Sequence, residues 1–128
     1  MSTYLLKNAT LVNEGNRFDA DILIDNERIA KIIKRGDKVN LPEDCQIIDY
    51  TGKYILPGAI DDQVHFRDPG LTRKGDLETE SRAAVAGGVT SFMDMPNTIP
   101  NVLTQEILEE KYRAAIGRSW ANYSFYMG

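Results

Sequence analysis

The chain has 128 residues, of which 42% are hydrophobic and 27% charged, with 15 Lys and Arg against 19 Asp and Glu and a net charge of −4. This composition is typical of a globular protein with one sizeable core, and it excludes a large multidomain protein within these residues. The acidic balance argues against nucleic acid as a partner, no uncharged stretch approaches the roughly 20 residues that span a bilayer, and the single Cys45 suits a reducing cytoplasm.

The N-terminal part, residues 1–57, has the pattern of short strands separated by polar turns. The runs that suit strands cover 4–12, 21–33 with a turn at 25–28, 45–50 and 54–56. A charged link over 34–44 separates the second and third of these runs. We therefore expect a small, antiparallel, β-rich unit that ends at Pro57.

After Pro57 the pattern changes to strands that alternate with helices. Strands are expected over 59–66, 89–95 and 120–127, and helices over 77–86 and after Thr104. Strands joined through helices form right-handed βαβ units with a parallel sheet. We therefore predict a second unit, of the α/β class, over residues 58–128.

Both predicted helices carry signals at their ends. Asp76 is suited to cap the first helix, and Gly87-Gly88 is suited to end it. Thr104 is suited to cap the second helix, in which Glu109 lies four residues before Arg113 and can pair with it. The apolar face of the second helix is formed by Leu108, Tyr112, Ala115 and Ile116.

Polar residues around the end of the first predicted strand of this unit suit a ligand site. Side chains alternate along a strand, so Asp61, Gln63 and His65 are expected on one face, with Arg67 following where the strand ends. In barrels of parallel strands the C-terminal strand ends meet at one rim, which would bring Asn97, after the next strand, to the same place. Arg67 suits a carboxylate, because a guanidinium binds that group through two hydrogen bonds.

Each of these residues also has a simpler interpretation when it is taken alone. A single His in an apolar strand is usually a hydrogen-bonded core residue, Arg67 could be a solvated loop charge, and Asn97 could be a turn residue after a proline. The motifs around them favour a site. These motifs are Pro57-Gly58-Ala59-Ile60-Asp61, Arg67-Asp68-Pro69-Gly70, the segment 82–90 and Met95-Pro96-Asn97-Thr98.

Together the motifs resemble the start of a dihydroorotase of the amidohydrolase superfamily. Pro-Gly-x-Ile-Asp is shared broadly in that superfamily, whereas Arg67-x-Pro-Gly combined with Met-Pro-Asn-Thr is far more selective. The resemblance implies an α/β fold in which residues 58–128 begin a (β/α)8 barrel and residues 1–57 form part of a small β-sandwich. Because a closed barrel needs about 250 residues, the barrel is incomplete here, and we expect an N-terminal fragment of a longer protein.

The resemblance also implies a reaction, the reversible cyclisation of N-carbamoyl-L-aspartate to dihydroorotate in pyrimidine biosynthesis. It implies one or two zinc ions that activate hydroxide and polarise the ring amide, with a carboxylate that moves the proton. His65 and Gln63 would lie at the metal with Asp61 beside them, and Arg67 and Asn97 would bind the substrate. No catalytic general base is expected in residues 1–128. The longer protein is expected to be a cytoplasmic homo-oligomer.

Gln63 departs from the family pattern, which has a His ligand at this place. A carboxamide is a much poorer zinc ligand than an imidazole. Either the longer enzyme works with fewer ligands on this strand, or the protein is a non-catalytic, dihydroorotase-like structural partner, for example of aspartate transcarbamoylase. Hydantoinases and allantoinases open similar ring amides and are rivals within the class, but their substrates need not carry the carboxylate that Arg67 and Asn97 suit.

Overall fold

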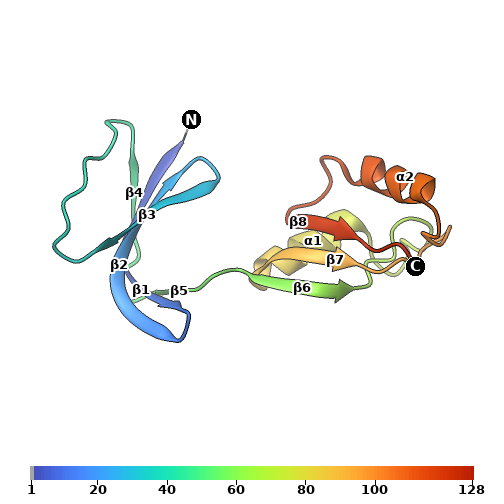
Figure 1. Ribbon diagram of the computed structural model, residues 1–128, viewed down its shortest axis with the longest axis horizontal. Coiled ribbons are helices and arrows are strands. Elements are labelled where there is room, and N and C mark those ends of the chain that lie inside the picture. The colour runs from blue at the N-terminus through green and yellow to red at the C-terminus, as the bar shows by residue number, and fades with distance from the viewer. Residues whose placement is uncertain (1) are drawn as a thin grey trace. The chain divides into compact units, whose positions relative to one another are not determined.

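The computed structural model describes residues 2–128, which form two compact units that meet in the sequence between Pro57 and Gly58 (Figure 1). The N-terminal unit is a single five-stranded sheet with the strand order β3-β2-β1-β4, in which β5 also pairs with β1. Its strands are β1 (Thr3–Asn13), β2 (Asn16–Asp25), β3 (Arg28–Lys34), β4 (Gln46–Asp49) and β5 (Tyr54–Ile55). Its buried cluster consists of Ala9, Leu11, Ala20 and Ile22.

Two hairpins build most of this sheet. The expected hairpin with its turn at 25–28 is confirmed by the antiparallel pairing of β2 with β3. A second hairpin between β1 and β2 was not expected, and it makes β2 begin at Asn16, five residues before the predicted strand. Its two-residue turn, Glu14-Gly15, has positive φ at both positions (49° and 73°). That geometry matches the twist of the flanking strands and so favours a tight hairpin.

The expectation of a purely antiparallel unit is wrong, because β4 and β5 both run parallel to β1. β2 already occupies one edge of β1, so later strands can join only at the other edge. A parallel neighbour needs a long connection, and the charged link between β3 and β4 supplies it. The link therefore brings the chain to the far edge of the sheet, where β4 runs in the direction opposite to β2.

The C-terminal unit is a three-stranded sheet with two helices. Its elements are β6 (Ala59–Val64), α1 (Leu77–Ala86), β7 (Val89–Asp94), α2 (Gln105–Ala115) and β8 (Asn122–Phe125). The expected α/β arrangement is confirmed, because the sheet has the order β6-β7-β8 with both pairs parallel. Leu77 of α1 and Ala115 of α2 belong to the same buried cluster as Phe92 and Phe125 of the sheet. Both helices thus share one core with the strands.

The ends of the helices follow local signals. The Asp76 carboxylate accepts a hydrogen bond from the Thr79 N–H at 2.9 Å, and this bond lowers the pKa of Asp76. Thr104 caps α2 by accepting from the Ile107 N–H at 3.4 Å. Ile116, expected on the apolar face of α2, is instead 71% exposed, because the helix ends at Ala115. Neither helix in the described residues is long and apolar enough to cross a membrane.

Candidate functional site

The ends of β6 and β7 define the first candidate site. The Met95 N–H donates to the Val64 carbonyl at 2.9 Å, just beyond the end of β7. The next free amide, that of Phe66, donates instead to the carboxylate of Asp94 at 2.9 Å. The predicted strand over 59–66 is therefore two residues too long, since a side chain replaces the strand partner at Phe66. His65 thus lies in the loop that follows β6.

His65 and Asn97 meet across these two strand ends. The imidazole Nδ1 lies 3.0 Å from the carboxamide oxygen of Asn97, and both residues are exposed. Because Asn97 offers an oxygen that can only accept, the proton of the neutral ring belongs on Nδ1. Nε2 then carries a lone pair that faces away from this contact and is suited to a metal ion. The amide nitrogen of Asn97 is left for another acceptor.

Arg67 lies two residues beyond His65 in a strained backbone conformation. Its φ is +67°, a left-handed value that few residues other than glycine adopt. The carbonyl of Arg67 accepts from the Leu71 N–H at 3.0 Å, which holds the loop in a turn. Within residues 2–128 its half-buried guanidinium makes no hydrogen bond or ion pair, so its donors remain available for an anion.

The loops after β6 and β7 are tied to each other. The Ile99 N–H donates to the Pro69 carbonyl at 3.1 Å. Gly70 lies so close to Ile99 that an added Cβ would be 2.3 Å from the Ile99 carbonyl oxygen, and its φ of +86° favours glycine as well. Asp68 holds the base of the first loop, because its carboxylate accepts from the Leu77 N–H at 3.1 Å and pairs with Arg118.

Asp61 and Gln63 are exposed and are not brought into contact with His65 by any hydrogen bond. The carboxylate of Asp61 accepts from the backbone N–H of Gln63 at 3.1 Å. The pairing of β6 with β7 is irregular between Asp61 and Val64, so the regular alternation assumed for this strand is interrupted there. The assignment of both residues to a metal site stays a prediction.

The metal-binding capacity of the described chain is small. No three His, Cys, Asp or Glu side chains converge within residues 2–128. His65 is the one histidine in the sequence. Zinc sites have either four protein ligands or three protein ligands and one solvent molecule. His65 and Gln63 would therefore need further ligands from outside this segment.

A buried ion pair that was not predicted from the sequence joins α2 to the end of β7. Lys111 of α2 and Asp94 at the end of β7 are 4% and 1% exposed, and their charged atoms lie 2.8 Å apart. The ammonium also donates to the Met95 carbonyl at 3.3 Å and lies 4.6 Å from the centre of the Phe125 ring. The sequence signal that could have indicated this burial is the position of Lys111, which lies three residues after Leu108 on the helix face that should be apolar.

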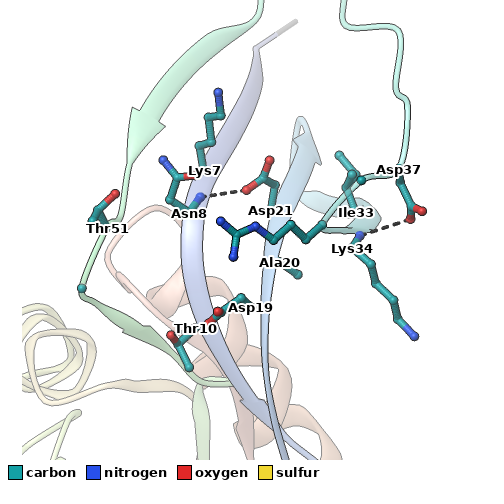
Figure 2. Close-up of a pocket in the computed structure, with 13 residues that line it drawn as sticks. Lys7, Asn8, Thr10, Asp19, Ala20, Asp21, Ile33, Lys34, Asp37 and Thr51 are labelled. Carbon is teal, nitrogen blue, oxygen red and sulfur yellow. Dashed lines mark hydrogen bonds between the residues drawn. The ribbon is translucent and has the colours of Figure 1, made fainter.

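A hollow over the sheet of the N-terminal unit contains none of the predicted site residues (Figure 2). Two of its carboxylates are used within the fold. The Asn8 N–H donates to the Asp21 carboxylate at 2.7 Å, and the Lys34 N–H donates to Asp37 at 3.2 Å. Figure 2 shows these two contacts as dashed lines between residues that line the hollow. Because none of the residues predicted for the site lines this hollow, we place the candidate site in the C-terminal unit.

The parallel sheet and the loop motifs define an amidohydrolase-like protein, and comparison with known proteins makes this more specific. Residues 52–123 match the family described as dihydro-orotase-like, and the chain belongs to this family. The resemblance inferred from the sequence is thereby confirmed.

Two curated relatives are dihydroorotases. The one from Streptococcus thermophilus strain CNRZ 1066 is 40% identical over 113 residues, which are 87% of this chain and 26% of the relative. The one from Sulfurihydrogenibium sp. is 46% identical over 100 residues, 77% of this chain and 23% of the relative. The chain therefore spans about a quarter of the length of these relatives.

Among solved structures, the chain is similar to an L-hydantoinase (dihydropyrimidinase) from Arthrobacter aurescens. The TM-score is 0.88 at 32% identity, with all of this chain and 28% of the hydantoinase covered. A D-hydantoinase from Bacillus sp. AR9 has a TM-score of 0.79 at 28% identity and is covered over 26% of its length. The fold of this chain is thus shared by enzymes whose names indicate action on cyclic amides.

Proposed function

We propose that this chain forms the first quarter of a dihydroorotase that interconverts N-carbamoyl-L-aspartate and dihydroorotate. The observation that carries the proposal is the pairing of His65 with Asn97 at 3.0 Å at the C-terminal ends of parallel strands. Arg67, whose guanidinium has no partner within residues 2–128, follows His65 by two residues in the same loop. Membership of the dihydro-orotase-like family and the identity of 40–46% to dihydroorotases support it.

The proposal includes a fold for the longer protein. Residues 58–128 would begin a (β/α)8 barrel, and residues 1–57 would contribute strands to a small β-sandwich. Two features support this: the parallel order β6-β7-β8, and the shared core in which both helices pack with the strands. In such barrels the helices form one outer layer and the active site lies at the C-terminal strand ends.

Arg67 and Asn97 are assigned to the substrate. Both the open and the cyclic substrate carry carboxylates, and the guanidinium of Arg67 has donors to spare. The amide nitrogen of Asn97 would donate to the same substrate while its oxygen holds His65. Arg67 would thereby set specificity for an acidic ring, and its strained φ would be maintained by the surrounding loop contacts.

His65 is assigned to a metal, with zinc as the proposed ion and one or two ions per site. Its Nε2 would be the ligand atom, because Nδ1 is occupied by Asn97. Gln63 would contact the ion weakly through oxygen or hold neighbouring groups, and Asp61 would stabilise this strand segment through the Gln63 N–H. A metal ion held there supplies Lewis-acid activation of the ring amide, and its other ligands and the general base would follow Gly128.

Two other functions have specific support. The similarity to hydantoinase structures favours a hydantoinase-like cyclic amidase. Gln63, where the dihydroorotase pattern has a His, favours a non-catalytic partner of an enzyme such as aspartate transcarbamoylase. Homo-oligomer formation and a cytoplasmic location belong to the same proposal.

The deciding experiment is a substrate comparison with the whole protein, including any residues that follow Gly128. Turnover of dihydroorotate, hydantoin and allantoin is measured before and after chelation and after zinc is restored. We expect turnover of dihydroorotate well above that of either neutral ring, lost on chelation. Preference for hydantoin would support the hydantoinase alternative. No turnover of any ring, together with co-elution with aspartate transcarbamoylase on gel filtration, would support the non-catalytic alternative.

A further inference from the structure

The buried ion pair joins the two segments that carry the candidate site residues. The two carboxylate oxygens of Asp94 have different partners: one accepts from the Phe66 N–H at 2.9 Å, and the other accepts from the Lys111 ammonium at 2.8 Å. The same ammonium donates to the Met95 carbonyl at 3.3 Å. One carboxylate and one ammonium therefore bind the backbone of both loops at once.

These backbone contacts lie next to the site residues. Phe66 is the residue after His65, and Met95 lies two residues before Asn97. The backbone position of Phe66 limits where the His65 ring can lie, and the position of Met95 limits the start of the Pro96-Asn97 turn. We propose that Lys111, through Asp94 and through the Met95 carbonyl, is a positioning residue that sets the contact between His65 and Asn97.

Net stability alone is a weak explanation for this pair. Removing two charges from water is costly, and a well-packed apolar pair of similar volume often gives equal or greater stability. An apolar pair would fill the space between α2 and β7 but could hold neither the Phe66 N–H nor the Met95 carbonyl. The pair thus supplies directional hydrogen bonds at the one place where the chain leaves both strands.

Tyr112, the next residue on α2, provides a matched comparison. Its hydroxyl contacts the Ser124 hydroxyl at 3.0 Å and accepts from the Phe125 N–H at 3.3 Å. Like Lys111 it ties α2 to the sheet through polar contacts, but these contacts are on β8 and not on the loops that carry His65 and Asn97. Tyr112→Phe therefore removes a helix-to-sheet hydrogen bond without releasing either loop.

The test measures the His65 ring directly in the whole protein. The ¹⁵N resonances of the imidazole are assigned by their loss in His65→Gln, and Asn97→Ala defines the Nδ1 resonance without its partner. The main variant is the double substitution Asp94→Asn with Lys111→Met. It leaves no unpaired buried charge, and the asparagine oxygen can still accept from the Phe66 N–H, so the link to Met95 is lost while the fold keeps a filled core.

We expect the double variant to recover the thermal stability that Lys111→Met loses, while its Nδ1 resonance moves at least halfway toward that of Asn97→Ala. Tyr112→Phe should leave the resonance at the wild-type position. A double variant with the wild-type resonance, or a shift of equal size in Tyr112→Phe, would show that the pair serves packing alone and would overturn the proposal.

The effect on turnover rests on the proposed function, whereas the resonance does not. If the whole protein hydrolyses dihydroorotate, the double variant should lose about 10- to 100-fold in kcat/KM, because a misplacement of about 1 Å costs that order of rate. Wild-type protein without any turnover would contradict the proposed function and still allow the resonance to decide the role of Lys111. If the double variant has a shifted resonance but wild-type kcat/KM, Lys111 positions His65 and Asn97 only in the free site. That result would overturn a role of Lys111 in catalysis.

Discussion

Asn8 in the N-terminal unit and Arg67 in the C-terminal unit share a left-handed backbone, with φ of 63° and 67°. Asn8 lies at the irregularity of β1 and is fully engaged: its N–H donates to Asp21, and its side-chain amide donates to Asp49 at 3.1 Å. Asparagine also tolerates this conformation well. Arg67 has neither advantage, since its guanidinium has no partner within residues 2–128. Contacts within the fold thus account for the backbone of Asn8, whereas the carboxylate proposed as a ligand would give the Arg67 side chain a partner.

The polar groups of the two units are also arranged differently. Around the hollow of the N-terminal sheet, the carboxylates of Asp21 and Asp37 accept from backbone N–H groups of the same unit. At the ends of β6 and β7 the buried pair of Asp94 and Lys111 holds the fold, while the guanidinium of Arg67 and the amide nitrogen of Asn97 have no partner within residues 2–128. We therefore expect the functional site where buried residues hold the fold and other side-chain donors are left for a ligand. The following substitutions test this division.

The largest effect is expected from Lys111→Met. It leaves the Asp94 carboxylate buried without its counter-ion, and breaking such a pair costs about 3–5 kcal/mol in the free energy of unfolding. Arg113→Met is the control, because its ion pair with Glu109 is exposed on the same helix and is worth less than about 1 kcal/mol. Denaturant unfolding followed by circular dichroism compares the two. Equal losses would mean that the pair is not desolvated as the structure indicates.

Arg67→Ala should reduce function while sparing the fold. Losing a charged hydrogen-bonding partner for a desolvated carboxylate should cost about 2–4 kcal/mol, or about 30- to 1000-fold in kcat/KM for dihydroorotate. Zinc content should not change, since Arg67 is assigned to the substrate. Asn8→Ala should do the opposite, with unchanged kcat/KM and a lower midpoint of unfolding. Wild-type kinetics in Arg67→Ala would remove the main reason for choosing an acidic ring.

Gln63→His sharpens the proposal for the metal. An imidazole at this position would add a strong ligand on the strand that leads to His65, so zinc affinity should rise by about tenfold or more. Loss of a residue that only hydrogen-bonds to a metal ligand already changes metal affinity by about 10- to 100-fold. His65→Ala should lower it. Elemental analysis of the whole protein at limiting zinc measures both. Identical metal content in wild type and both variants would mean that this strand is not a metal site.

The smallest effect concerns acid stability. The Thr79 N–H lowers the pKa of Asp76 in the folded state, so ionised Asp76 stabilises α1 above its unfolded pKa, and this contribution is lost as the pH falls through the lowered pKa. Asp76→Asn retains a capping oxygen that does not titrate. The difference in stability between wild type and Asp76→Asn should therefore shrink below about pH 4, as followed by thermal unfolding. A difference that is constant with pH would assign the cap to hydrogen bonding alone.

The parts of this structure that could be predicted are those encoded by neighbouring residues. Asp76 and Thr104 cap their helices, and the turn at 25–28 forms its hairpin, because each signal acts within a few positions. The parallel pairing of β4 with β1 could not be derived this way, since it depends on which sheet edge is still free. β6 ends early because a carboxylate 28 positions away takes the Phe66 N–H, and no local pattern contains that bond.

The predicted site shows the same division. The contact of His65 with Asn97 fits the expectation that two strand ends meet, which follows from parallel topology alone. The placement of Asp61 and Gln63 on the same face as His65 was argued from regular alternation, and the irregular pairing after Asp61 removes that basis. Their roles at a metal were implied by the family resemblance and stay a prediction. Lys111 was missed because a charged residue on an amphipathic helix is normally solvated, and its partner is visible only in three dimensions.

The close approach of Gly70 to Ile99 has a consequence for changing the specificity of this protein. Because the backbone of one loop fills the space beside the other, and Ile99 donates to Pro69, the two loops cannot vary in shape independently. A loop transplanted alone from a hydantoinase would lie against a neighbouring loop whose backbone does not fit it. Exchange of substrate preference should therefore require residues 66–70 and 95–100 to be grafted as a pair, and natural insertions in either loop should be accompanied by changes in the other.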